Sequence, residues 1–171
     1  MKALSVSTQI PDAYRAGIYL GEQLAETMPE VVFLFTSIDY GNNGDILNGL
    51  KDGLNQPNCL IIGNSGDGFY ESYGIGEYGA SALALNSHGQ IQWLLKVGHK
   101  VTDHPKEATR QALDGHEKAS LIFMVSDFHA DASLIESVIE NEVHIPIVGG
   151  FAADDQQWDA CAIYTADGVQ N

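Results

Sequence analysis

The sequence predicts an α/β fold, with a mixed, mostly parallel sheet flanked by helices and built from two tandem duplicated β-α-β-α-β-β units. Three observations support this prediction. Short, continuous apolar runs alternate along the chain with segments that carry apolar residues at helical spacing. The same order of elements occurs twice. The 171 residues, 44% of them hydrophobic and 18% charged, suffice for one sizeable core.

Four continuous apolar runs are predicted strands. They lack the alternation of a half-exposed strand, and continuous apolarity is typical of parallel strands that are covered on both faces. The runs are 31–35, 59–62, 121–125 and 145–148. We expect these strands at the centre of the sheet.

Two further segments make the predicted sheet mixed. Residues 80–86 and 91–97 flank the turn-like sequence Ser87-His-Gly. Such an arrangement predicts an antiparallel hairpin.

Four helices are predicted between these strands. Three have an apolar stripe at helical spacing and begin after the capping residues Asp12, Asn43 and Asp131, whose side-chain oxygens can accept the free N–H groups of a first turn. The remaining helix, 103–115, carries Pro105 in its first turn, where proline is tolerated.

An internal repeat relates the two halves of the chain. Residues 31–37 align with 120–126 at an offset of 89 (126 − 37), and residues 61–63 align with 147–149 at an offset of 86 (149 − 63). We therefore predict a single domain, 1–171, whose repeat units are about 1–89 and 90–171 and share one core.

The charge, the apolar runs and the cysteines of the chain limit the kinds of partner and the cellular location that we expect. Its 23 acidic and 8 basic residues give a net charge of −15, which repels nucleic acids and anionic membrane surfaces. No apolar run approaches the ~20 residues of a membrane helix, and no signal-peptide core occurs at the start. Cys59 and Cys161 lie in apolar runs and are expected to be reduced core residues. These features predict a cytoplasmic protein that binds neither nucleic acid nor membrane.

Each predicted unit leads from a strand into a glycine-rich segment, 63–68 in the first and 149–154 in the second. Ligands bind at the carboxyl ends of strands in open α/β sheets, although such glycines can also simply turn the chain. We expect backbone N–H groups to hold a carboxylate, and Asp127, Asp154 or the aromatic loop described below to hold an amino group. The candidate ligand-binding residues are Ser37, Gly63, Asn64, Ser65, Gly68, Phe69, Ser126, Asp127, Gly149, Gly150 and Asp154.

An aromatic loop lies between two predicted strands. Its rings, Phe69, Tyr70, Tyr73 and Tyr78, could stack on a planar ligand or surround an ammonium group. The alternative is that they pack the loop onto the sheet.

Two motifs point to catalysis, and neither is complete. The segment 63–67 resembles the nucleophile elbow of serine hydrolases around Ser65, but Asp67 replaces the last glycine and no helix is predicted to follow. Asp127, His129 and Asp131 alternate like metal ligands, but Asp131 already serves as a helix cap. We predict no catalytic residue, metal or cofactor.

Four motifs carry a resemblance to a known family. They are Ser-Thr-x-x-Pro-Asp-Ala at 7–13, Val-Phe-Leu-Phe at 32–35, Ile-Gly-x-Ser-x-x-Gly at 62–68 and Pro-Ile-Val-Gly-Gly-x-Ala-x-Asp at 146–154. In their order and spacing the chain resembles the N-terminal part of the FIST (F-box and intracellular signal transduction) domain. The resemblance implies a sensory module that binds a small ligand without catalysis. It also implies a signalling output domain or partner protein as its second partner.

The leading hypothesis is therefore an intracellular signal-input domain for a small polar metabolite such as an amino acid. One alternative is an interaction scaffold whose acidic surface docks a basic partner. A further alternative is a serine hydrolase or a metal-dependent hydrolase.

Overall fold

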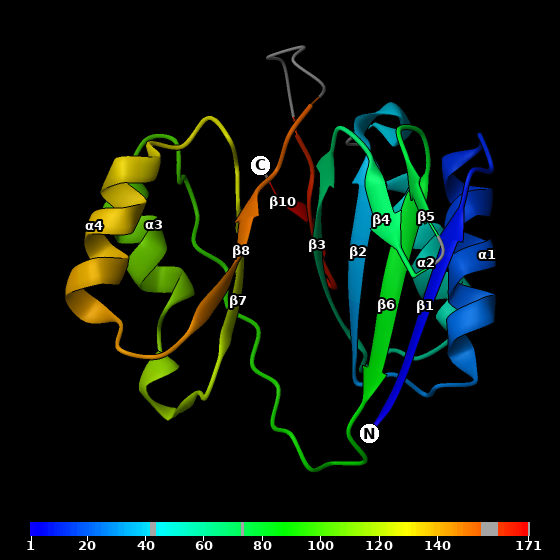
Figure 1. The fold of residues 1–171 in the computed structure, drawn as a ribbon, viewed down its shortest axis with the longest axis horizontal. Coiled ribbons are helices and arrows are strands. Elements are labelled where there is room, and N and C mark those ends of the chain that lie inside the picture. Colours follow the sequence, from blue (N-terminus) through cyan, green and yellow to red (C-terminus); the bar gives the residue numbers. More distant parts are fainter. Residues whose placement is uncertain (42–43, 73, 155–160, 171) are drawn as a thin grey trace. The chain divides into compact units, whose positions relative to one another are not determined.

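The computed structural model describes residues 1–41, 44–72, 74–154 and 161–170, which form two compact units (Figure 1). The first unit comprises Met1–Trp93 and Ala153–Gln170, and the second comprises Leu94–Ala152. The chain thus passes from the first unit to the second after Trp93 and returns after Ala152.

The first unit is built on a six-stranded sheet in the order β1-β6-β2-β3-β9-β10. Its strands are β1 (Lys2–Thr8), β2 (Val31–Ser37), β3 (Leu60–Gly66), β6 (Ala80–Asn86), β9 (Ile163–Thr165) and β10 (Gly168–Gln170). Among the described strands of this unit only β2 and β3 pair in parallel, so the prediction of a mostly parallel sheet is wrong for it. The reason is that β6 lies between β1 and β2 and runs antiparallel to both.

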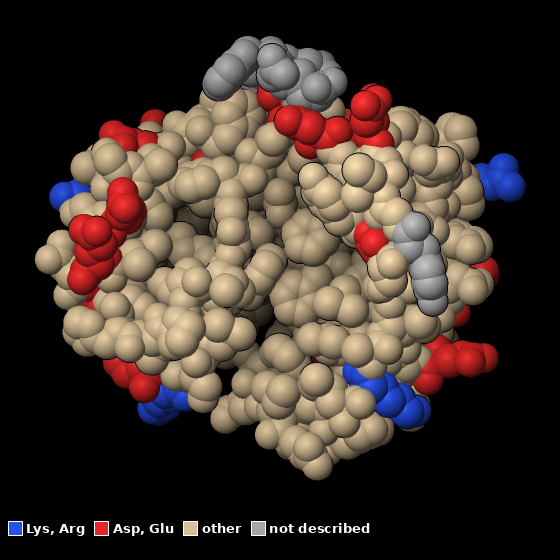
Figure 2. All heavy atoms as spheres, viewed as in Figure 1, with Lys and Arg blue, Asp and Glu red and all other residues tan. Residues whose placement is uncertain are grey.

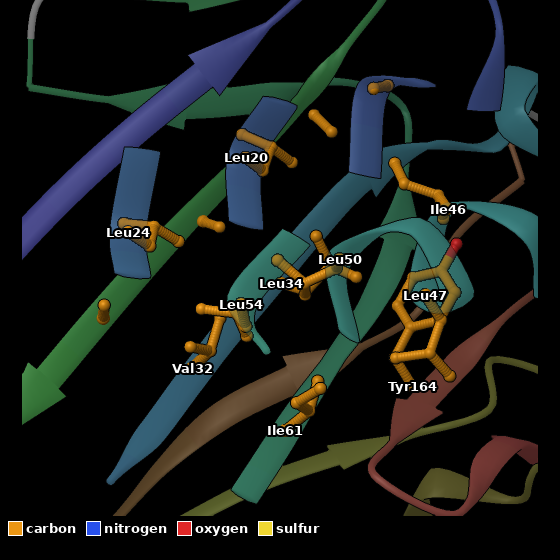
Figure 3. Packing of buried hydrophobic residues seen from close by; sticks show 14 of the residues in the cluster. Leu20, Leu24, Val32, Leu34, Ile46, Leu47, Leu50, Leu54, Ile61 and Tyr164 are labelled. Atoms are coloured by element: carbon orange, nitrogen blue, oxygen red, sulfur yellow. The ribbon is translucent and has the colours of Figure 1, made fainter. Parts of the chain in front are cut away.

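Helices α1 (Ala13–Ala25) and α2 (Asp45–Leu54) pack on this sheet and enclose the main core (Figure 3). Along β2 the side chains alternate in burial, with Val32 and Leu34 fully buried and Phe33 and Phe35 half-buried. The same face continues in β6 as small residues, which leave room for the helices. The most deeply buried members are Leu20, Leu24, Val32, Leu34, Ile46, Leu47, Leu50, Ile61 and Tyr164.

Two glycines on each helix bring α1 and α2 into close contact. Gly17 and Gly21 of α1 face Gly49 and Gly53 of α2, and a Cβ atom at any of the four would overlap backbone atoms of the other helix. The helices therefore pack backbone against backbone.

The predicted cap Asp12 is confirmed, because its carboxylate accepts a hydrogen bond from the Arg15 N–H at 2.8 Å. Helix α2 begins after Gly44, and the predicted cap Asn43 lies outside the described residues.

The predicted hairpin of 80–86 with 91–97 is wrong. Strand β6 forms, but residues 91–97 form no strand, because the chain turns away at Ser87 and Gly89. Glu30 holds this turn by accepting hydrogen bonds from the N–H and hydroxyl of Ser87, the Gly89 N–H and the Trp93 indole N–H. The backbone beyond Trp93 then leads into the second unit.

A short hairpin, β4 (Phe69–Glu71) and β5 (Gly74–Gly76), follows β3 and contacts β1, β2 and β6 (Figure 1). The one-turn helix η1 (Ile38–Tyr40) follows β2. A hydrogen bond of 3.1 Å between the hydroxyls of Ser5 and Ser72 ties the hairpin to β1.

The second unit contains two parallel strands, β7 (Ile122–Ser126) and β8 (Ile147–Phe151). Helices α3 (Pro105–Ala112) and α4 (Ala132–Glu142) pack against each other, and the one-turn helix η2 (His116–Lys118) lies between α3 and β7. The core of the second unit is small, with Leu113, Val138 and Val143 buried.

Two sequence predictions for this unit are confirmed and one is wrong. Helix α3 forms with Pro105 in its first turn, and Asp131 caps α4 by accepting from the N–H groups of Ser133 and Leu134. Strand β8 is largely exposed, with Val148 and Phe151 at 49% and 43%, and is not the predicted strand covered on both faces.

Each unit contains a strand, a helix and a parallel strand in succession, namely β2-α2-β3 and β7-α4-β8. The rest of the two sheets differs, because the second unit has no counterpart of the antiparallel strands of the first in the part of the chain that is described. The duplication stays a prediction.

Acidic side chains occupy several patches of the face seen in Figure 2, and basic side chains occupy few, as the net charge of −15 leads one to expect. Among the helices of the described residues, none is long and apolar enough to cross a bilayer.

Candidate functional site

The carboxyl ends of β1, β2 and β3 meet at one edge of the six-stranded sheet. Both β1 and β2 run antiparallel to β6, and β3 runs parallel to β2, so all three point the same way. Thr8 of β1 and Thr36 of β2 both pair with Ala80, the first residue of β6. The edge is therefore of the kind at which α/β sheets bind ligands.

A cavity of about 310 Å³ lies at this edge, between the end of β1 and the β4–β5 hairpin. Its lining contains three residues with hydroxyl or amide side chains, one acidic residue, one aromatic residue, one aliphatic residue and one glycine. Its lining residues are Ser7, Thr8, Gln9, Phe69, Glu71, Gly74 and Ile75. Such a mixture of apolar surface and a few polar groups is typical of small-molecule sites.

Phe69 fastens the hairpin to the sheet. Its ring is 6% exposed and lies against Gly76 and Gly79, where a Cβ atom would come within 2.6 Å of it. Gly79 also has a φ of 141°, a conformation that favours glycine. The hairpin therefore depends on glycine at both positions to seat the ring.

Glu71 and Gly74 are cross-strand partners, so their Cα–Cβ directions fall on one face of the hairpin. Phe69 is two residues before Glu71 on the same strand and shares that face. No atom of the described residues lies within 4 Å of a Cβ atom built on Gly74, and the φ of Gly74 is not in the left-handed region. The cavity is thus open at this position.

Ser65 is engaged inside the chain. Its hydroxyl is fully buried, donates to the Ala153 carbonyl at 3.0 Å and accepts from the Ala162 N–H at 2.9 Å. Its donor and its acceptor function thus join β3 to Ala153 and Ala162, which follow the return of the chain from the second unit to the first. In this structure the hydroxyl is closed off from any substrate.

The predicted glycine turns are strands in part, which corrects the sequence interpretation. Gly63 lies within β3, and Gly149 and Gly150 lie within β8. A Cβ atom at Gly63 would overlap the carbonyl oxygen of Leu34, and one at Gly149 would overlap that of Met124. Both glycines therefore allow close approach of the neighbouring parallel strand.

Four of the remaining predicted residues lie in the first unit. Ser37 accepts a hydrogen bond from the Gly79 N–H at 3.2 Å, and Asn64 donates to the Ser65 carbonyl at 2.7 Å. Gly68 sits in the turn between β3 and β4, where a Cβ atom would come within 2.5 Å of the Gly76 carbonyl. Asp154 is 3% exposed and follows Ala153, whose N–H donates to the Ser65 carbonyl.

Ser126 and Asp127 lie at the carboxyl end of β7 in the second unit. The Ser126 hydroxyl is buried without a hydrogen-bond partner among the described residues. Asp127 contacts the His129 ring, with 2.9 Å between Oδ1 and Nδ1. The predicted residues are thus divided between the two units, and a cavity common to both groups stays a prediction.

Phe69 is the predicted ligand-binding residue that lines the cavity, and sequence reasoning missed the others. Ser7 and Thr8 belong to the first motif of the family resemblance, and Glu71 stands inside the aromatic loop. These signals were present, but only the strand order brings β1 and the hairpin together.

Two rings of the aromatic loop, Phe69 and Tyr78, pack the loop onto the rest of the unit, which was the alternative to ligand binding. The Tyr78 ring contacts Tyr40 at 5.5 Å between centroids, and the Tyr78 hydroxyl donates to the Pro11 carbonyl. Tyr70 is 80% exposed, and Tyr73 lies outside the described residues. Burial and the neighbouring Tyr78 raise the pKa of the Tyr40 hydroxyl.

Cys59 and Cys161 are buried and not joined in a disulfide, as predicted, and burial raises the pKa of the Cys59 thiol to about 11. The thiol is therefore protonated at neutral pH. In the part of the chain that is described, no three His, Cys, Asp or Glu residues are grouped so that they could hold a metal ion.

Comparison with known proteins gives one match. The family model of the FIST N domain matches residues 30–171, which is most of the chain. No curated protein and no solved structure matches.

Proposed function

This chain belongs to the FIST N domain family, a family of sensory signal-transduction domains, and from that premise we propose that it binds a small ligand in the cavity between β1 and the β4–β5 hairpin. The ligand is a small polar metabolite, and the bound state is passed to a signalling output domain or partner protein. The domain acts in the cytoplasm.

The observation that carries this proposal is the position of the cavity. It lies at the carboxyl end of β1, at the same sheet edge as the ends of β2 and β3. Strand β1 is held by seven paired residues of β6, so one wall of the cavity is rigid. Polar groups from this wall can fix the orientation of a ligand, while Phe69 supplies an apolar surface.

The other wall suits a signal-input role. The hairpin pairs over only three residues on each side, and its outward side chain Tyr70 is 80% exposed. A ligand that contacts both walls stabilises the closed position of the hairpin and so changes the surface around Tyr70. That surface is available to an output partner because Tyr70 is exposed. The ligand favours the closed position of the hairpin to the extent that it binds this position more tightly than the open one.

Binding without catalysis fits the same structure. The hydroxyl of Ser65, the candidate nucleophile, is fully buried and hydrogen-bonded at both functions. The cavity lining contains no Ser-His pair among the described residues. We therefore propose a receptor rather than a hydrolase.

A cavity-filling variant tests the proposal. A panel of amino acids and related small polar metabolites should include members that raise the Tm of the wild-type chain, because a ligand at 100 times its Kd stabilises the folded state by about 2.7 kcal/mol. Gly74→Leu places a side chain on the cavity face without backbone strain and should abolish the shift.

Tyr70→Leu is the matched control, because it introduces the same side chain into the same hairpin at a position that does not line the cavity. This variant should keep the Tm response. If Gly74→Leu responds to the ligand like the wild type, the ligand binds elsewhere and the proposed site is wrong.

A further inference from the structure

We propose that this cavity selects a small organic amine with an apolar body, held by an ion pair with the Glu71 carboxylate. The inference rests on the proposed function, because it names the chemical class of ligand for the same site. It is carried by the lining of the cavity, in which the carboxylate of Glu71 and the aromatic ring of Phe69 share one face of the hairpin.

Glu71 is available to a ligand. Its side chain is half-buried at the cavity, and it makes no hydrogen bond or ion pair with any described residue. A half-buried carboxylate with no partner among the described residues gains from a cation that arrives with the ligand, since a charge-assisted hydrogen bond is about twice as strong as a neutral one.

The charge of the lining disfavours ligands that carry a carboxylate. None of the described residues around the cavity is Lys, Arg or His, and the whole chain carries a net charge of −15. The carboxylate of an amino acid would therefore lie close to Glu71 with no cationic side chain to offset the repulsion. An amine without a carboxylate avoids this cost.

The remaining lining matches the rest of such a ligand. Ser7 carries a hydroxyl at the end of β1, on the same strand face as Ser5, whose hydroxyl is hydrogen-bonded to Ser72 in the hairpin. Phe69, on the same face of the hairpin as Glu71, offers apolar surface for a ring or an alkyl chain. An aromatic amine can therefore pair its ammonium with Glu71 and rest its ring on the hairpin.

A series of four matched probes tests this selectivity on the whole chain. The probes are 2-phenylethylamine, its neutral isostere 2-phenylethanol, the anion 3-phenylpropionate and the zwitterion phenylalanine. Kd values are measured by NMR titration at 0.15 M salt, where charges more than about 8 Å away are largely screened. The amine should bind about tenfold more tightly than the alcohol, and more tightly than phenylalanine.

Two variants with the same change of charge separate the local ion pair from the overall charge. Glu71→Gln should reduce the amine to the affinity of the alcohol. Glu22→Gln, on an exposed position of α1 away from the cavity, should keep the tenfold preference. If Glu71→Gln is folded, its affinity for 2-phenylethanol should equal that of the wild type. Loss of binding of the alcohol would show that the variant is not folded.

The amine inference is overturned if the amine binds no more tightly than the alcohol, or if Glu71→Gln keeps the preference. When a metabolite nevertheless gives a Tm shift that Gly74→Leu removes, the proposed function stands and only the choice of ligand class is wrong. When neither the probes nor the metabolites bind, the inference and the proposed function fall together.

Discussion

Glu30 illustrates how one side chain decides the path of the backbone. Its carboxylate accepts hydrogen bonds from the Ser87 hydroxyl, the Trp93 indole and the backbone N–H groups of Gly89 and Ser87. These bonds, with the Ser87 hydroxyl contributing most, lower the pKa of Glu30 to about 2. The carboxylate is charged at neutral pH and holds the turn that sends the chain into the second unit.

The lowered pKa of Glu30 predicts a pH-dependent contribution to stability. A carboxyl whose pKa is lowered in the folded state stabilises the fold above its unfolded pKa of 4.5, and this stabilisation is lost as the pH falls toward about 2. Glu30→Gln should lower the Tm at pH 7, and its difference from the wild type should shrink steadily below pH 4.5. Tm measured from pH 7 to pH 3 by circular dichroism checks this, with Glu22→Gln as the charge-matched control.

A difference that stays constant from pH 7 to pH 3 would mean that the ionised form of Glu30 is not what holds the turn.

Ser65 predicts a second residue-scale effect. Ser65→Ala leaves the Ala153 carbonyl and the Ala162 N–H without the hydroxyl between them. Each buried polar group left unpaired costs about 1–3 kcal/mol, so the free energy of unfolding should fall by at least that amount. Urea denaturation measures it, and Ser120→Ala, which removes an exposed hydroxyl, should have little effect. An unchanged stability of Ser65→Ala would show that the hydroxyl is not needed where β3 meets the returning segment.

At the scale of elements, the contact between α1 and α2 depends on the absence of side chains. The Cβ atom of an alanine at position 49 would overlap the Tyr14 carbonyl oxygen and approach the Ile18 nitrogen to 3.0 Å. Because these are backbone atoms, no rotamer change relieves the overlap. The helices would have to move apart over Leu20 and Leu50, which are fully buried.

Gly49→Ala should therefore destabilise the chain, although alanine is the better helix former by about 1 kcal/mol. Overpacking of this kind costs about 1–3 kcal/mol, and the overlap with backbone favours the upper end of that range. Asn48→Ala changes the next residue on the exposed face of α2 and should be neutral or slightly stabilising. Guanidinium denaturation of both variants decides the sign, and stabilisation by Gly49→Ala would contradict the close packing.

At the scale of the whole molecule, the two units differ in how much core supports them. The first unit buries a large cluster that includes Leu20, Leu34 and Leu50, each fully buried. The second buries Leu113, Val138 and Val143 beside a sheet of two strands. Two-stranded sheets are marginal without extensive packing, and local stability follows buried apolar contact.

We therefore expect the amides of β7 and β8 to exchange with solvent deuterium faster than those of β2 and β6. Hydrogen–deuterium exchange followed by mass spectrometry at pH 7 resolves the four strands. Equal protection in β7 and β2 would indicate that the two units unfold as one cooperative body, contrary to this expectation.

Helices and strands could be predicted where the residues that specify them, such as caps and apolar runs, are neighbours in the sequence. Helices α1 and α4 were predicted with their caps Asp12 and Asp131, because a cap acts within three residues of itself. The apolar runs located β2, β3, β7 and β8 to within a few residues, because backbone pairing and burial favour the same residue types. Membership of the family was also recognisable from four short motifs, and the family model confirms it.

The sequence by itself therefore determined the class of fold, its main helices and strands, the family and the acidic charge of the surface. Only the tertiary structure decided that β6 lies between β1 and β2, that Gly63 and Gly149 serve strand packing, and that Ser65 is closed off by the segment returning from the second unit. It also decided that Ser7, Thr8 and Glu71 line one cavity. The physical reason is range: propensity, capping and periodicity act over a few neighbouring residues, whereas strand order and cavity lining depend on contacts between residues far apart in the sequence, such as Thr36 with Ala80 and Ser5 with Ser72.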